Sequence, residues 1–135
     1  MRTQAVLELA DLKCIAAAAE AEALRNNWAV SIAIVDAGGH LLWCQRLDGA
    51  APHTAHFAPA KAHAAATSKR DSAYLETMIN EGRTAFLSAP FLQGMLEGGV
   101  PIVKDGQVIG AVGVSGVKAA DDAKVARAGI AALGL

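Results

Sequence analysis

The stretch between Val30 and Leu47 constrains the fold more than any other part of the chain. It contains two strand-like runs separated by a turn cluster, Asp36-Ala37-Gly38-Gly39. Glycines supply the positive φ angles of tight hairpin turns, and an aspartate ahead of them can accept hydrogen bonds from the turn backbone. The stretch therefore predicts a β-hairpin, and we assign Asp36 chiefly to the turn.

A second hairpin is predicted nearer the C-terminus. Asp105-Gly106 separates the runs Pro101–Lys104 and Gln107–Val114, and Asp-Gly is a strong two-residue hairpin signal. The second run and the residues after it contain three glycines, Gly110, Gly113 and Gly116. Glycine weakens a strand, so these positions indicate either the close approach of a helix, a subunit or a ligand, or bulges and tight packing against alanine-rich helices.

Three helices are predicted from apolar spacing and capping residues. They are Thr3 to about Asn26, ended by Asn26-Asn27; Ser72 to Asn80, with Ser68, Asp71 or Ser72 as the cap; and a last helix to about Leu133, with Asp121 or Asp122 as the cap. Asparagine suits the end of the first helix because it tolerates the left-handed conformation.

A fourth, alanine-rich helix is predicted around Lys61 to Thr67. Its first turn is open between two alternatives. A start after Ala58 places Pro59 at the first helical position, where its missing N–H is harmless, whereas a start at Thr54 places the proline inside the helix.

The order helix, hairpin, helices, hairpin, helix predicts an α+β fold, in which helices pack on an antiparallel sheet. The segment Gly82–Gly99 is apolar and irregular, and such a segment more often covers a core or a partner than lies in water. The 135 residues suit one domain, 1–135.

Composition excludes several functional classes. Lys and Arg number 12 and Asp and Glu 13, with no basic run, which argues against a nucleic-acid partner. Gln4, Glu8 and Asp11 interrupt the apolar stretch that a signal peptide needs, and no apolar run reaches the roughly 20 residues of a membrane span, so we expect a cytoplasmic protein. Aromatic residues make up only 4%, and small side chains bury little area, so we expect a homo-oligomer.

Three of the four histidines, His53, His56 and His63, follow the first hairpin and lie near Lys61 and Arg46 in sequence. Histidine titrates near neutrality, and its neutral form is a common ligand of metals and haem iron. His56 and His63 would share a helix face, whereas His53 and His56 would share one only if the loop is helical. We therefore expect any chemistry to come from this loop.

Motifs for a bound metal ion are weak. The H-x-x-H of His53 and His56 lacks the glutamate of H-E-x-x-H, which excludes the zinc-protease site, while a non-catalytic zinc site completed by other ligands remains open. Cys14 and Cys44 form no C-x-x-C motif, and we expect both to be small buried apolar side chains.

Two blocks carry a family resemblance. They are V-S-I-A-I-V-D-A-G-G-H-L-L with R-L-D-G-A, between Val30 and Ala50, and G-G-V-P-I with G-Q-V-I-G-A-V-G-V-S-G, between Gly98 and Gly116. In the same order they resemble the GlcG/HbpS family, also described as haem-degrading or PduO C-terminal-like domains. The resemblance implies a profilin-like α/β/α fold with a five-stranded antiparallel sheet, assembled into dimers or larger rings and octamers. The fifth strand would come from Gly82 to Gly98 or from a split of Lys104 to Ser115.

The resemblance also bears on the site. Lys61 matches the family's A-K-A run, and Gly98-Gly99 matches a loop that would border the ligand pocket, preceded here by Glu97 where relatives often have proline. His53 and His56 stand where many relatives have small or apolar residues. Val117 replaces a glycine after V-S-G. These departures imply a modified pocket.

Two functional hypotheses follow. In the first, the protein binds a small ligand, haem or a corrinoid, with His53 or His56 as the axial ligand and Arg46 or Lys61 pairing a propionate. In the second, it is a small cofactor-independent enzyme such as a tautomerase, lyase or hydrolase of a catabolic pathway. A histidine would then transfer protons of a ring-opened or keto carboxylic acid, Lys61 or Arg46 would hold the carboxylate, and Gly98 and Gly99 would offer backbone N–H groups. The family resemblance favours binding.

Overall fold

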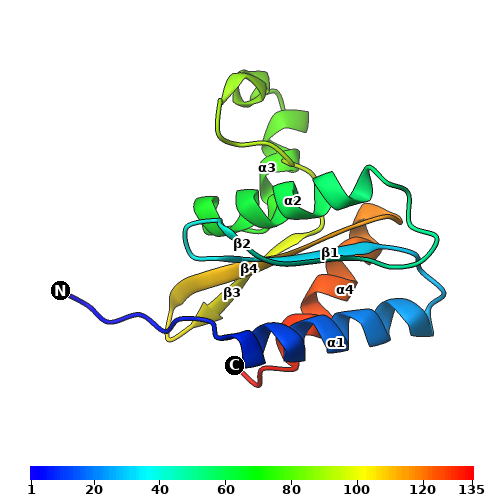
Figure 1. Ribbon diagram of the computed structural model, residues 1–135. Helices are drawn as coiled ribbons and strands as arrows, with labels where there is room; N and C mark the ends of the chain where they lie inside the picture. The colour runs from blue at the N-terminus through cyan, green and yellow to red at the C-terminus, as the bar shows by residue number, and fades with distance from the viewer.

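The computed structural model describes residues 1–135 and places one antiparallel sheet between two layers of helices (Figure 1). In chain order the elements are α1 (Leu9–Arg25), β1 (Ser31–Asp36), β2 (Leu41–Arg46), α2 (Thr54–Ser68), α3 (Ser72–Asn80), the 3₁₀ helix η1 (Thr84–Ser88), β3 (Gly99–Lys104), β4 (Gln107–Ser115) and α4 (Ala119–Ala131). Helices α1 and α4 cover one face and α2 covers the other, while α3 and η1 project beyond α2 as an arm.

The sheet has four strands in the order β2-β1-β4-β3, so the prediction of five strands is wrong. Neither proposed source supplies the fifth. The segment 82–98 turns into η1 and a loop, and β4 runs unbroken opposite β3, with only a register shift between Ile102 and Val103. The α+β architecture itself agrees with the prediction.

Both predicted hairpins form where their turn residues are. Asp36 Oδ1 accepts hydrogen bonds from the backbone N–H groups of Gly38 and His40, each at 2.9 Å. In the second hairpin Asp105 and Gly106 have φ angles of 50° and 73°, and two successive positive φ values are what a type I′ turn requires.

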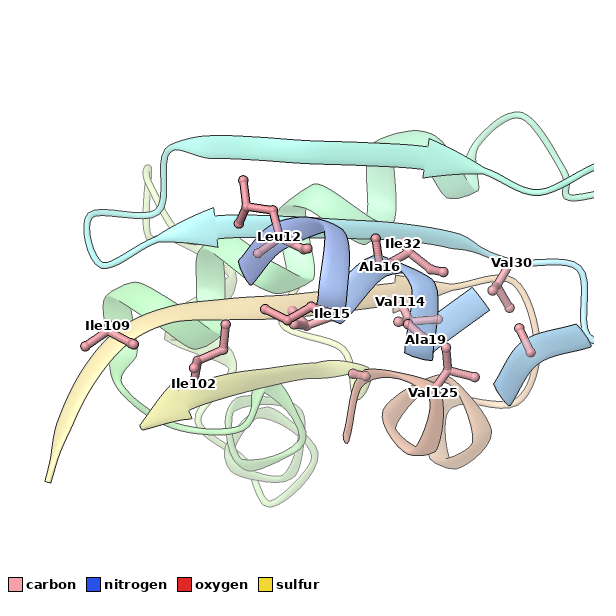
Figure 2. Packing of buried hydrophobic residues seen from close by; sticks show 14 residues of the cluster. Leu12, Ile15, Ala16, Ala19, Val30, Ile32, Ile102, Ile109, Val114 and Val125 are labelled. Carbon is pink, nitrogen blue, oxygen red and sulfur yellow. The ribbon is translucent and has the colours of Figure 1, made fainter. Parts of the chain in front are cut away.

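The main core lies between the sheet and the layer formed by α1 and α4. Figure 2 shows side chains of α1, both central strands and α4 converging there, among them Ile15, Ile32, Val114 and Val125. All four are fully buried.

The opposite face of the sheet packs tightly against the alanine-rich α2. A Cβ atom at Gly113 would collide with the backbone carbonyl oxygen of Ala58. At this glycine the structure therefore shows tight packing against an alanine-rich helix, which was one of the explanations left open.

Several predicted helix ends differ from the structure. Helix α1 begins at Leu9 and not at Thr3, because the preceding segment is extended and hydrogen-bonded to β4. Gln4 Nε2 donates to Val108 O at 2.9 Å, and Gln107 Nε2 donates to Thr3 O at 2.8 Å. Helix α4 has Lys118 at its N-cap position and not Asp121 or Asp122, which lie in its first turn. None of the helices is both long enough and apolar enough to cross a membrane.

The two cysteines are exposed and free, so the prediction that they are buried is wrong. Cys44 lies on β2, which is an edge strand and therefore has no strand on its outer side. Cys14 lies on α1 among the exposed residues of that helix, with Sγ 3.6 Å from the Ala132 carbonyl oxygen.

Candidate functional site

The first turn of α2 presents two histidines to solvent. His53 is the N-cap residue with helical φ and ψ, so His53 and His56 lie one turn apart on a continuous helix that contains Pro59. Both histidines are exposed. The His53 ring meets the edge of the half-exposed Phe57 ring, with centroids 5.1 Å apart. By contrast, the chain's other two histidine rings are hydrogen-bonded within the protein.

The start of α2 is fixed to the sheet by two buried hydroxyl groups. Thr54 Oγ1 lies 2.8 Å from Ser31 Oγ of β1 and donates to Ala51 O at 2.6 Å. Ser31 is paired directly with Arg46 of β2, and paired residues of antiparallel strands point to the same face of a sheet. Arg46 therefore lies on the α2 side, beside the turn that carries His53 and His56, and its exposed side chain is free to meet a ligand.

Lys61 lies inside the protein. It is 4% exposed, and its Nζ donates to Val114 O at 3.0 Å and to Asp122 Oδ2 at 3.1 Å. Asp122 is 2% exposed, and its other carboxylate oxygen accepts from Val117 N at 3.1 Å. This placement differs from the exposed, ligand-holding cation that we expected at position 61. The reason is that the partner that holds Lys61 comes from α4, far along the chain.

Burial raises the pKa of Asp122, and the charge of Lys61 and hydrogen bonds from Lys61 and from backbone N–H groups offset only part of this effect. Lys61 and Asp122 therefore form a buried ion pair between α2 and α4, which cover opposite faces of the sheet. Such a pair is a structural connection, and its ammonium is not available to a ligand from solvent.

The Gly98-Gly99 loop packs around Lys61. A Cβ atom at Gly98 would lie 2.9 Å from Lys61 Nζ, and one at Gly99 would collide with the Lys61 backbone. One backbone group of each glycine is also in use, because Gly99 N donates to Ser72 Oγ at 2.8 Å and Gly98 O accepts from Val114 N at 3.0 Å. The half-buried Glu97 next to them donates its backbone N–H to Glu76 Oε2 at 3.4 Å.

The predicted site residues thus fall into two groups. Arg46, His53 and His56 meet at an exposed surface, whereas Lys61, Gly98 and Gly99 meet in the interior. None of the five main hollows of the surface is lined by a residue of the first group. The structure also contains no cluster of three or more His, Cys, Asp or Glu side chains suited to a metal ion.

One pair of polar side chains was missed by the sequence analysis as a candidate site. His40 Nδ1 lies 3.1 and 3.2 Å from the two carboxylate oxygens of Asp36. Burial alone would raise the pKa of Asp36, but hydrogen bonds from the backbone and ring of His40 and from Gly38 lower it overall. The signal is the four-residue spacing of an aspartate and a histidine across a glycine turn, although the sequence assigns Asp36 chiefly to turn formation.

The fold defines a class: small α+β domains with a four-stranded antiparallel sheet and helices on both faces. The chain belongs to the HbpS-like family of haem degrading proteins, because the family model matches residues 7–131.

Individual relatives agree with this assignment. The Escherichia coli K12 protein GlcG is 51% identical over 115 residues, which are 85% of each chain. A double mutant of Streptomyces reticuli HbpS has a solved structure with a TM-score of 0.90 at 30% identity, covering 100% of this chain and 92% of that one. The solved PduOC:heme complex has a TM-score of 0.83 at 29% identity, covering 95% of each chain.

Proposed function

We propose that this protein binds a tetrapyrrole, haem or a corrinoid, at the start of α2. The observation that carries the proposal is the pair of exposed imidazoles of His53 and His56, which are free of internal hydrogen bonds, beside the half-exposed ring of Phe57. A haem iron needs only one or two axial ligands from protein, so an isolated imidazole on an apolar surface suits it better than it suits a bare metal ion. The solved PduOC:heme complex supports the same ligand class.

Each residue of this surface has a defined role in the proposal. His53 or His56 supplies a neutral ring nitrogen to the iron. Phe57 offers an apolar ring against the macrocycle, and Arg46 pairs a propionate through its planar guanidinium, which matches a carboxylate in geometry. Lys61, Gly98 and Gly99 support the helix from inside and do not touch the ligand.

The alternative, a small enzyme acting on a keto or ring-opened carboxylic acid, has weaker support. It relied on Lys61 or Arg46 to hold a carboxylate and on Gly98 and Gly99 to donate backbone hydrogen bonds. The Lys61 ammonium is paired with Asp122, and Gly99 N is bonded to Ser72. Only the histidines, Arg46 and the backbone N–H of the buried Gly98 remain for that chemistry.

We also propose that the chain self-associates, as a dimer or a larger ring up to an octamer. The arm formed by α3, η1 and the following loop exposes three large apolar side chains, Leu87, Phe91 and Leu96, which are 67%, 83% and 44% exposed. A hollow of about 340 Å³ between Ile79, Leu92 and Met95 adjoins them. Apolar residues gathered on a projecting arm are typical of a contact surface.

The test is an absorbance titration of the protein with haemin. Wild type should give a sharpened Soret band, and H53A, H56A or the double variant should change it, whereas T67A, at the exposed opposite end of α2, should not. Because ligation requires an unprotonated ring nitrogen, the band should also be lost at mildly acidic pH. If neither single variant nor the double variant alters the spectrum, the axial assignment to α2 is wrong even where haem binds.

A further inference from the structure

We propose that a hollow between the N-terminal segment, the end of α2 and the β3–β4 turn binds a small organic dianion, a short dicarboxylate, and that Arg2 and Lys69 hold its two carboxylates. This site is separate from the exposed histidines, because Lys69 lies at the opposite end of α2 from His53. The inference follows from the charge of the lining, the anchoring of both cations and the apolar part of the walls.

The charge of this hollow sets it apart from the other hollows of the surface. It has a volume of about 300 Å³, and its charged lining residues are Arg2 and Lys69. Each of the other four main hollows is lined by at least one aspartate or glutamate. Neither cation belongs to an ion pair; the side chains that do pair with carboxylates are Arg25, His40, Lys61, Lys124 and Arg127. Two unpaired positive charges that line one hollow create a positive potential in it, which favours an anion.

Arg2 is carried by a segment that is anchored to the fold. The side chains of Gln4 and Gln107 bond this segment to β4, and Leu7 packs against the main core. Figure 1 shows the segment passing the end of the sheet where β3 and β4 join. The guanidinium of Arg2 therefore starts from a backbone that is held beside the hollow.

Lys69 reaches the hollow from the C-terminal end of α2. It is the C-cap residue and has a φ of 59°, in the left-handed region that favours glycine. Its backbone N–H still closes the helix by donating to Ala66 O at 3.3 Å. A lysine held where a glycine would be less strained points to a role for the side chain itself.

The rest of the lining favours an organic anion over an inorganic one. Val103 and Val108 form an apolar part of the walls, which suits the methylene chain of a dicarboxylate. The arginine fork matches one carboxylate in a bidentate manner, and the lysine ammonium meets the other as a point charge. Asp105, in the turn beside the hollow, is not among the lining residues. A volume of about 300 Å³ lies at the lower end of the range for small-molecule pockets, which favours a short ligand.

The experiment is isothermal titration calorimetry of the full chain, without an N-terminal tag, with malonate, succinate and glutarate at low ionic strength, where charge attraction is least screened. We expect saturable binding of at least one of the three. R2M and K69M should each weaken it about 3- to 10-fold, and the double variant should abolish it. R2K should lie between wild type and R2M, because lysine keeps the charge and loses the fork.

Lys13 provides the matched control. It is an exposed lysine of α1 that belongs to no ion pair and lines none of the five hollows, so K13M changes the net charge as K69M does and should leave binding unchanged.

The variant Lys69→Gly separates ligand binding from a structural role. Glycine is the residue that the positive φ at this position favours, so K69G should keep or raise the midpoint of urea denaturation. It should nevertheless weaken dicarboxylate binding as much as K69M does. A lysine with only a structural role would change the midpoint and leave the affinity unchanged.

Four results would overturn the proposal. They are a wild-type protein that binds none of the three dicarboxylates, a loss of affinity in K13M equal to that in K69M, uncharged succinamide that binds as tightly as succinate, and inorganic phosphate that binds as tightly as the best dicarboxylate. The first two remove the site, the third removes the role of the cations, and the last removes the choice of an organic dianion.

Discussion

Removing the Lys61 cation from the buried Lys61–Asp122 ion pair should destabilise the fold strongly. The pair joins α2 to α4, and the two residues are 4% and 2% exposed. Lys61 Nζ also donates to Val114 O of β4. The substitutions K61M and D122N each leave the opposite charge in the interior with no compensating charge.

The expected magnitude follows from the geometry. At the 3.1 Å separation of Lys61 Nζ and Asp122 Oδ2, Coulomb attraction in an effective dielectric of about 20 amounts to about 5 kcal/mol. Desolvation of both charges offsets much of this attraction, so the intact pair contributes little net stability. A charge left alone keeps its desolvation penalty, so we expect K61M to lose about 3 to 5 kcal/mol of unfolding free energy. D122N should lose less, because burial raises the pKa of Asp122 and so disfavours its charged form in the folded protein.

The double variant K61M/D122N separates the pair from other effects. With neither charge present, its loss should be smaller than the sum of the single losses by about 1 to 3 kcal/mol. Urea denaturation measures all four proteins, and an unchanged slope shows that the free energies are comparable. Lys124 and Asp121 provide the matched control, because this exposed pair on the same helix has its charged atoms 3.4 Å apart and should contribute at most about 1 kcal/mol.

The pH dependence has a defined sign. Because burial raises the pKa of Asp122 above its ordinary value of 3.8, the folded state binds this proton more tightly than the unfolded chain does. The contribution is complete below the unfolded pKa and is lost as pH rises through the folded pKa. Wild type should therefore lose stability relative to D122N above about pH 4. A K61M variant that loses less than about 1 kcal/mol, or strictly additive losses, would refute the account.

Three further predictions concern packing, association and thiol reactivity. Gly113→Ala should lose about 1 to 3 kcal/mol in urea denaturation, because the added Cβ collides with the α2 backbone, and an unchanged midpoint would contradict this contact. Replacing Leu87 and Phe91 with serine should lower the mass measured by light scattering without altering secondary structure, whereas a wild-type monomer of 13.8 kDa at micromolar concentration rules out self-association. The exposed thiols of Cys14 and Cys44 should react with a disulfide reagent in the native protein. Partial burial raises the pKa of Cys44, so Cys44 in the variant C14S should react more slowly than Cys14 in the variant C44S. Thiols that react only after unfolding would show that both cysteines are buried.

The features that were predictable from sequence are those with local causes. Asp105-Gly106 forms its turn because the two positive φ angles are a property of that dipeptide, and Asn27, with a φ of 57°, follows the end of α1 for the same kind of reason. The place of His53 and His56 on the first turn of α2 was left open by the sequence, because Pro59 allowed a helix start either at Thr54 or after Ala58.

The features that were not predictable depend on residues far apart in the chain. Residues 3 to 8 do not join α1, because Gln4 Nε2 donates to Val108 O and Gln107 Nε2 donates to Thr3 O, each across 104 positions. Lys61 is buried because its partner lies 61 residues away on α4. Cys44 is exposed because the strand order leaves β2 at an edge, and strand order is not encoded by any local pattern.

Asp36 is predictable as a turn residue, but the sequence does not show that it has a second role, which is to hold the ring of His40. The hydrogen bonds from Gly38 N and His40 N that make it a turn residue also aim its carboxylate at the ring of the histidine that ends the turn. From sequence, turn formation and a role in a site are competing explanations of one aspartate. In the structure they are one arrangement, because a carboxylate held by the backbone is a better orienting group for an imidazole than a mobile one. A glycine turn followed by histidine four residues after an aspartate is therefore worth testing as a site even where the turn alone explains it.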